Sequence, residues 1–383
     1  MDFAAAGMLD GLEGDERAAR VQLLERLTAE GYTVEELQAA VTEDRLALLP
    51  VQRVLGGQHT AREIEARTGI PAELLLRNRR LLGLPEAGPD DRVFSDEDVA
   101  AGASIRTYLE LGLGEDAIAE IARVLGEAMA RVAATSTAVF ADAFLEQGDS
   151  EEDVAWRFAA LAEELTSRVQ PVLLAAYKAH LRETVQRGVI SRAELEAGQL
   201  VGEQDTAVCF ADLVGFTTLG TEIEGDELGS VIGRFGELAA GVADARVRLV
   251  KTIGDAAMLT AREPAPLVEA ALSLLEAVEE ADLPSLRAGV AWGRALPRGG
   301  DLYGHAVNLA SRVTAVARPG SVLCTKEVRD AALEEYDWSF AGRHRLKGIG
   351  EAVPLYRARR LSSESESGAI SRKAGRPRRR ASH

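Results

Sequence analysis

Two aspartates, Asp212 and Asp255, have the residue type and the surroundings expected of a metal-binding pair. Asp212 lies near the end of the apolar, strand-like run 206–213, and Asp255 follows the run 247–253 and a glycine. Carboxylate oxygens are the ligands that hard divalent cations prefer. If folding brings the two side chains together, they could hold divalent metals against the phosphates of a nucleotide.

A second set of polar residues follows downstream. Asp301 comes after the glycine-rich turn 297–300, and Asn308 and Arg312 are four residues apart in a helical pattern. Residues at this spacing share one face of a helix. A guanidinium group matches the geometry of phosphoryl oxygens. Together with the two aspartates, this series predicts a binding site for a nucleotide and its metal ions.

Each of these residues also has an ordinary structural explanation when it is taken singly. A pair such as Gly254-Asp255 is common in turns, and Lys251 could extend its ammonium group into solvent at a strand end. Arg312 could be a surface charge on a helix. These explanations do not account for the whole set, because each residue would have to occur at its place in the series by a separate coincidence. The sequence has no P-loop, no His-Glu-x-x-His motif and no cysteine pair with zinc spacing that would indicate another chemistry.

The composition limits the classes of protein that the chain can belong to. Its 383 residues allow two domains, and 46% hydrophobic residues is typical of a globular protein. A net charge of −17 argues against a protein that coats nucleic acid. We find no apolar stretch that could cross a bilayer and no signal peptide, so we expect a cytoplasmic protein. Cys209 and Cys324 lie in apolar runs, and we expect both to be buried, unpaired thiols.

Residues 1–202 have the pattern of an all-α domain. Sequences typical of helix N-terminal capping boxes begin at four positions, namely Thr33, Thr60, Ser95 and Ser150. The last opens a long amphipathic helix, in which we expect Pro171 to cause a kink or a restart. The stripe of apolar residues along this helix could face a core or a partner helix.

After residue 202, short strand-like runs alternate with helical patterns. We expect strands at 206–213, 247–253, 256–260, 286–292 and 321–324, and helices near 228–238, 267–278 and 307–316. This order predicts an α/β domain with a ferredoxin-like βαββαβ arrangement over residues 203–360. Residues 361–383 read as a disordered basic tail, because six basic residues and no acidic ones occur from 371 to 383. A faint likeness of 375–378 to a minor-groove-binding hook is the weaker interpretation.

The segment from about 205 to 357 resembles the catalytic domain of the class III adenylyl cyclases, in particular soluble actinobacterial members with a helical N-terminal regulatory domain. Residues 210–217 (FADLVGFT) resemble the first metal motif of the family, and residues 251–255 (KTIGD) resemble the second. The resemblance implies that two divalent ions, Mg²⁺ or Mn²⁺, are bound by Asp212, Asp255 and the Leu213 carbonyl. It also implies that phosphates meet the backbone N–H groups of Gly215, Phe216 and Thr217.

The reaction implied by the resemblance is the conversion of ATP to 3′,5′-cyclic AMP and pyrophosphate. Lys251 would donate to adenine N1 and Asp301 would accept from the N6 amino group, which discriminates against guanine. Asn308 would orient the ribose, and Arg312 would stabilise charge on the α-phosphoryl group. Lys347, in the segment RLKGIG, resembles a lysine that binds the β- and γ-phosphates.

The resemblance also implies a homodimer with two equivalent shared sites. One chain would supply Asp212 and Asp255 to a site, and the other would supply Lys251 with the residues Asp301, Asn308 and Arg312. The first domain would dimerise and restrain the catalytic pair through a coupling segment at 181–202, with a proton or a lipid as the effector. His180 is a candidate pH sensor, although an ordinary histidine at a helix end is an equal alternative.

A different function class is suggested by residues 60–84 with 94–99, which resemble the helix-turn-helix of MerR-type regulators. Arg77, Arg79 and Arg80 on the second helix could contact DNA phosphates. The chain would then be a DNA-binding regulator with an appended cyclase-like domain. The acidic surroundings argue against a nucleic-acid partner, so this is the weaker hypothesis.

Overall fold

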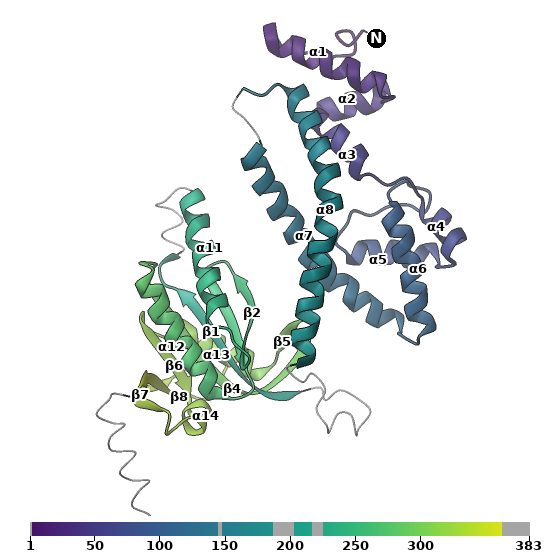
Figure 1. Ribbon diagram of the computed structural model, residues 1–383. Coiled ribbons are helices and arrows are strands. Elements are labelled where there is room, and N and C mark those ends of the chain that lie inside the picture. Colours follow the sequence, from purple (N-terminus) through teal and green to yellow (C-terminus); the bar gives the residue numbers. More distant parts are fainter. Residues whose placement is uncertain (1, 145–147, 187–202, 217–224, 362–383) are drawn as a thin grey trace, which may run out of the picture. The chain divides into compact units, whose positions relative to one another are not determined.

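The computed structural model describes residues 2–144, 148–186, 203–216 and 225–361 (Figure 1). The chain divides into two compact units, Met1–Gln186 and Arg187–His383. Residues 187–202 of the predicted coupling segment and residues 362–383 of the predicted tail lie outside the described residues. No helix of the described residues is long and apolar enough to cross a membrane.

The described part of the first unit is helical, as predicted. Its elements are α1 (Gly14–Ala29), α2 (Val34–Thr42), the 3-10 helix η1 (Leu46–Leu48), α3 (Leu49–Leu55), α4 (Ala61–Thr68), α5 (Ala72–Leu81), α6 (Asp96–Glu110), α7 (Glu115–Phe144) and α8 (Glu151–Gln186). Capping boxes are present at Thr33, Thr60 and Ser95. Ser150 likewise accepts a hydrogen bond from the Asp153 amide at 3.1 Å. The four predicted helix starts are therefore confirmed.

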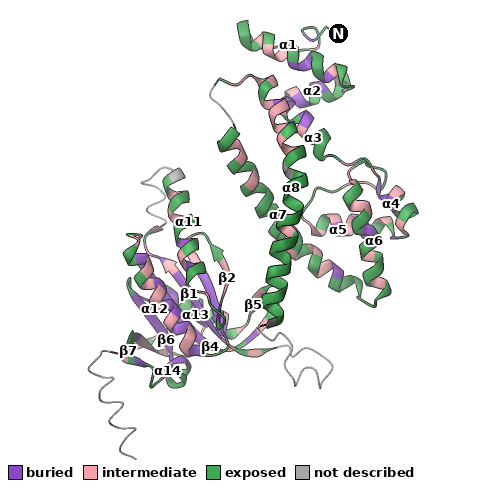
Figure 2. Ribbon diagram, in the orientation of Figure 1, coloured by how far each residue is buried: buried purple, intermediate pink, exposed green. Residues whose placement is uncertain are grey.

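Pro171 lies inside α8, and the helix continues through it. The expected restart at this proline is therefore wrong. A proline removes one helical hydrogen bond, but a long helix that packs against its neighbours can tolerate that loss. Helix α8 packs against α1, η1 and α3. Much of its second half is exposed (Figure 2).

The second unit contains one mixed β-sheet among its described residues. The strands are β1 (Gln204–Leu213), β2 (Val247–Ile253), β3 (Ala256–Ala261), β4 (Leu286–Arg298), β5 (Asp301–Tyr303), β6 (Ser321–Thr325), β7 (Tyr336–His344) and β8 (Val353–Arg360), in the order β2-β3-β1-β4-β6-β8-β7, with β5 paired to β4. The helices are α11 (Gly225–Gly241), α12 (Pro264–Glu280), α13 (His305–Val316) and α14 (Lys326–Ala331). The first part, β1-α11-β2-β3-α12-β4, has the predicted βαββαβ order.

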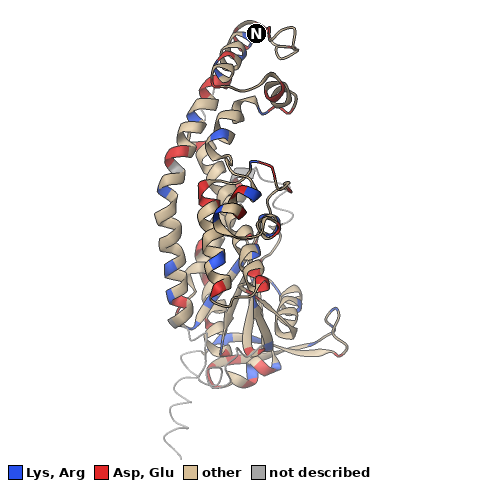
Figure 3. Ribbon diagram, turned by 90° about the vertical axis from the view of Figure 1, so that its right-hand side faces the viewer, with Lys and Arg blue, Asp and Glu red and all other residues tan. Residues whose placement is uncertain are grey.

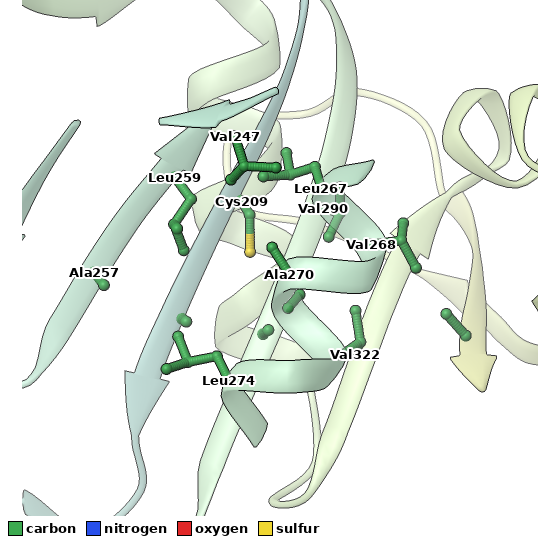
Figure 4. Packing of buried hydrophobic residues seen from close by; sticks show 14 of the residues in the cluster. Cys209, Val247, Ala257, Leu259, Leu267, Val268, Ala270, Leu274, Val290 and Val322 are labelled. Carbon is green, nitrogen blue, oxygen red and sulfur yellow. The ribbon is translucent and has the colours of Figure 1, made fainter. Parts of the chain in front are cut away.

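Alternate residues of β1 face two different cores. Cys209 and Ala211 belong to a core that includes residues of α11, α12 and α14, with α12 packed over the sheet (Figure 4). Val208 and Phe210 face the core beneath α13. Asp212 has the same parity as Phe210 and therefore emerges on the α13 side of the sheet. Burial raises the pKa of Cys209 to about 12, and both Cys209 and Cys324 are free and buried, as expected.

Candidate active site

Asp212 and Asp255 are neighbours at one end of the sheet. Asp212 is the penultimate residue of β1, and its register partner on β3 is Ala256, the residue after Asp255. The backbone N–H of Leu213 donates to the Asp255 carbonyl at 3.0 Å, which ties the two segments together. Gly254 turns the chain between β2 and β3 with φ of +57°, a conformation that favours glycine. Strand pairing and a tight turn thus bring the predicted carboxylate pair together.

The electrostatics of this pair reflect the partial burial of Asp255 and its closeness to a second carboxylate. The pKa of Asp255 is raised above its ordinary value, first by burial and then by the charge of Asp212, while Arg287 acts in the opposite direction. The Arg287 guanidinium donates to Asp212 Oδ2 from Nε at 2.8 Å and from Nη2 at 2.5 Å. Asp212 therefore has a cationic partner, whereas Asp255 is held in an environment that disfavours its ionised form.

Lys251 and Asp301 form an ion pair between their Nζ and Oδ2 atoms. Lys251 comes from β2, and Asp301 opens β5 at the end of the β4–β5 hairpin. The second carboxylate oxygen, Oδ1, accepts from the Leu302 amide at 2.8 Å, which orients the Asp301 side chain. Folding thus places a hydrogen-bond donor beside an acceptor, although fifty positions separate them in the sequence.

Asn308 and Arg312 lie on the exposed side of α13. The opposite side of this helix is buried against the sheet, and the Thr314 hydroxyl on that side donates to the Phe210 carbonyl at 3.1 Å. Within the described part of the chain, no hydrogen bond or ion pair joins Asn308 or Arg312 to either aspartate. The helix therefore presents these two side chains away from the sheet that carries Asp212.

Two family models match the chain in this order. The model described as the adenylate cyclase regulatory domain matches residues 1–185, and the model described as the adenylate and guanylate cyclase catalytic domain matches residues 201–356. A protein named as a pH-sensitive adenylate cyclase of Mycobacterium tuberculosis is 38% identical over 372 residues, which cover 94% of this chain and 93% of that relative. The chain belongs to the class III adenylate cyclases.

Other members of the family are similar over most of their length. An adenylate cyclase of Streptomyces coelicolor is 32% identical over 330 residues, with 82% of this chain and 84% of the relative covered. Among solved structures, the adenylyl cyclase CyaB of P. aeruginosa matches 42% of this chain and 96% of its own, with 19% identity and a TM-score of 0.37.

The aspartate pair of this cyclase domain fits a divalent cation. Carboxylates supply the hard oxygen ligands that Mg²⁺ and Mn²⁺ prefer. The pKa of Asp255 is raised first by burial and then by the Asp212 charge, and a bound cation would stabilise its ionised form against both. Among the described residues, no third Asp, Glu, His or Cys joins the pair. The remaining ligands would have to be backbone, phosphate or water oxygens.

The predicted phosphate-binding residues are only partly described. Gly215 has φ of +81° in the turn after β1, and Phe216 packs against the core under α12. Thr217 lies outside the described residues. Lys347 is exposed in the turn between β7 and β8, directly after the buried Leu346. The structure does not bring Lys347 into contact with the other candidate residues among those described.

Arg287 was not among the site residues predicted from the sequence. This arginine lies at the start of the predicted strand 286–292, where a single basic residue carries no distinctive signal. Its importance comes from the register, because Arg287 on β4 is the partner of Asp212 on β1. An arginine at the edge of an apolar run could have been noted as a candidate, but its carboxylate partner could not.

Two of the three arginines proposed for DNA contact have partners within the regulatory domain, whereas Arg80 is exposed. Arg77 forms ion pairs with Glu115 and Asp116. Arg79 donates to the Pro85 and Val93 carbonyls, both at 3.3 Å. Basic and acidic residues are interspersed along the helices (Figure 3). The structure therefore offers no observation that favours the helix-turn-helix hypothesis over the family assignment.

Proposed function

We propose that this chain converts ATP to 3′,5′-cyclic AMP and pyrophosphate as a homodimer with shared active sites. The observation that carries the choice of ATP is the ion pair between Lys251 and Asp301. An ammonium beside a carboxylate matches the acceptor at adenine N1 and the donor at N6. Guanine reverses both polarities, so it would leave both groups unsatisfied. The proposed substrate also implies a cytoplasmic location.

Asp212 and Asp255, assisted by the Leu213 carbonyl, hold two divalent ions in this proposal. Bound Mg²⁺ or Mn²⁺ would supply the positive charge that favours ionisation of the ribose 3′-hydroxyl and neutralises the triphosphate. The backbone amides of Gly215, Phe216 and Thr217 donate to the phosphates. In this proposal Arg287, which donates to Asp212, transfers these hydrogen bonds to a phosphate oxygen when substrate binds.

The groups that act on the reacting atoms are Asn308 and Arg312. The 3′-oxygen attacks the α-phosphorus, and the bond to the oxygen of the leaving pyrophosphate breaks. Asn308 orients the ribose for this in-line geometry. Arg312 stabilises the charge that develops on the α-phosphoryl oxygens, and Lys347 binds the β- and γ-phosphates.

A homodimer is supported by two surfaces of the chain. On α13, Asn308 and Arg312 point away from the sheet of their own chain, as residues that act in a partner's site must. On α8, large apolar residues at helical spacing are exposed, namely Leu174 at 52%, Tyr177 at 64%, Leu181 at 48% and Val185 at 68%. An apolar stripe of this kind is the usual signature of a partner helix. We infer that a second copy covers it.

The effector of the regulatory domain is, in this proposal, a proton or a lipid. The similar mycobacterial protein carries the description pH-sensitive. A groove of about 560 Å³ between α3, α7 and α8 is lined mainly by apolar residues, including Leu55, Phe140 and Phe158, and suits an acyl chain. His180 is exposed on α8. Comparing the pH–activity profiles of the full chain and of residues 203–383 tests proton sensing, because identical profiles would exclude an N-terminal sensor.

The proposed activity has a direct test. Purified protein with ATP and Mn²⁺ or Mg²⁺ should produce cyclic AMP, and Asp212→Ala should abolish production. Asp205→Ala is the matched control, since Asp205 is an exposed aspartate on the same strand and should leave activity intact. The double substitution Lys251→Glu with Asp301→Cys should weaken the use of ATP. Full retention of ATP preference would show that the base-reading residues are assigned wrongly.

A further inference from the structure

A cavity of the catalytic unit lies on the α13 side of the sheet, over β6, β8 and β7. Its volume is about 280 Å³, which is slightly below the ~300–1,000 Å³ of sites for drug-sized ligands. The polar side chains that line it are Arg318, Ser339, His344 and Arg357. None of the described residues that line it is acidic. We call this cavity the basic hollow.

Strand register places Arg357 at the centre of the basic hollow. Arg357 on β8 is paired with Leu323 on β6 and with Ser339 on β7, so the three side chains form one row on the same face. The Nε atom of Arg357 is buried and has no hydrogen-bond partner among the described residues. A buried, unpaired donor on a charged group is unfavourable and requires an explanation. An anionic acceptor in the hollow would provide one.

Two further features favour a small anion. Arg318, in the loop after α13, is exposed and has no ion-pair partner among the described residues, so its guanidinium is available to the hollow. The second is the absence of acidic residues from the described lining of the hollow. Two arginines in a hollow with no acidic residue in its described lining concentrate positive charge in a chain whose net charge is −17.

We propose that the basic hollow binds a phosphate-type anion, with Arg318 and Arg357 as its charged ligands. Guanidinium groups suit phosphate oxygens because they donate several hydrogen bonds in a fixed plane. The ligand is either free phosphate or the phosphate of a small phosphorylated compound. The residues proposed for catalysis do not line the hollow, so it is a separate site.

The test is a calorimetric titration of the full chain, without divalent metals and at constant ionic strength, with sodium phosphate, pyrophosphate and AMP in separate experiments. One phosphate should bind per chain. Arg318→Gln and Arg357→Gln should each weaken binding about tenfold or more, since each removes a charge-assisted donor. Arg343→Gln is the matched control, because Arg343 lies on the same hairpin, donates to the Ala352 carbonyl and does not line the hollow.

The outcomes separate the two sources of the anion. If AMP binds and the Arg318→Gln substitution weakens that binding, the ligand is a small phosphorylated compound. If phosphate binds, AMP does not, and the substitution weakens phosphate binding, the ligand is free phosphate. Arg318 is exposed, so its substitution should leave the fold intact, which a thermal melt checks. Binding that is unchanged in Arg318→Gln, binding that is lost in Arg312→Ala instead, or no binding of any of the three anions would overturn the proposal.

Discussion

The shared-site model predicts that two inactive variants restore activity when they are mixed. Asp212→Ala removes a proposed metal ligand, and Arg312→Ala removes the proposed charge-stabilising group on the outward face of α13. Loss of one transition-state donor costs roughly 10²–10³ in kcat, or about 2.7–4 kcal/mol. Each variant alone should therefore retain at most about 1% of the wild-type rate.

The expected recovery follows from the symmetry of the dimer. Random reassociation of equal amounts of the two variants makes about half of the dimers mixed, and each mixed dimer has one intact site of two. The mixture should therefore reach about one quarter of the wild-type rate per chain. Cyclic AMP formation is measured across mixing ratios, and it should be greatest at equal amounts and fall towards zero at either end.

A matched control isolates the sharing of the site. Asp212→Ala mixed with Asp255→Ala places both lesions in the same half, so each site of a mixed dimer lacks one of the two aspartates and no recovery is expected. The mixed dimers are verified by co-purification of differently tagged chains. If Asp212→Ala with Arg312→Ala shows no recovery although mixed dimers form, or if the control recovers, the sites are not divided as we infer.

Three further predictions follow from particular contacts. Because the pKa of Asp255 is raised in the folded state, ionisation of its carboxyl group lowers the free energy of unfolding. The stabilising contribution of the protonated carboxyl is fully present below its unfolded-state pKa of about 3.9 and is lost as the pH rises through its folded-state pKa. Metal-free Asp255→Asn should therefore melt at a higher temperature than the wild type at pH 7 and at the same temperature near pH 4; equal melting at pH 7 would contradict this. Arg287→Gln should lower kcat/KM for ATP roughly tenfold or more, because a charge-assisted donor beside Asp212 is lost, and unchanged steady-state kinetics would remove Arg287 from the site. Gly289→Ala should reduce the free energy of unfolding by about 1–3 kcal/mol in a urea titration, since its Cβ would lie 2.3 Å from the Thr314 amide nitrogen, whereas Gly236→Ala, where an added Cβ meets nothing, should not destabilise the protein.

The fold was predictable where the hydrophobic pattern is strong. The strand expected at 247–253 begins and ends at these residues in the structure, because pairing with β3 and the turn at Gly254 define its two ends. The strand expected at 286–292 extends instead to Arg298 and forms a hairpin with β5. Strands β7 and β8 were not predicted, since their residues are largely polar or partly exposed and lack a clean apolar alternation. Pairing with β6 and with each other creates these strands, and a local pattern does not record that.

The candidate site was predictable in its residue types and not in its partners. Motif spacing singled out Asp212, Asp255, Lys251 and Asp301. It gave no indication that Arg287 contacts Asp212, because that contact depends on the register of β1 against β4, 75 positions apart. Long-range register is set by the whole sheet, whereas spacing reports only what is local.

The pairings seen within one chain indicate how the site can be stable before substrate binds. Lys251 neutralises Asp301, and Arg287 neutralises Asp212, so in each pair a half-buried charge has an opposite partner. Binding of ATP would then exchange partners, because the adenine edge can satisfy both Lys251 and Asp301, and a phosphate oxygen can take the hydrogen bonds of Arg287. Release of Arg287 would leave the Asp212 carboxylate free for a cation, so nucleotide and metal binding would favour each other. In such an exchange each half-buried charge keeps an opposite partner at every step, so the free-energy cost of an unpaired charge is avoided. A site whose charges had no partners before binding would bear that cost.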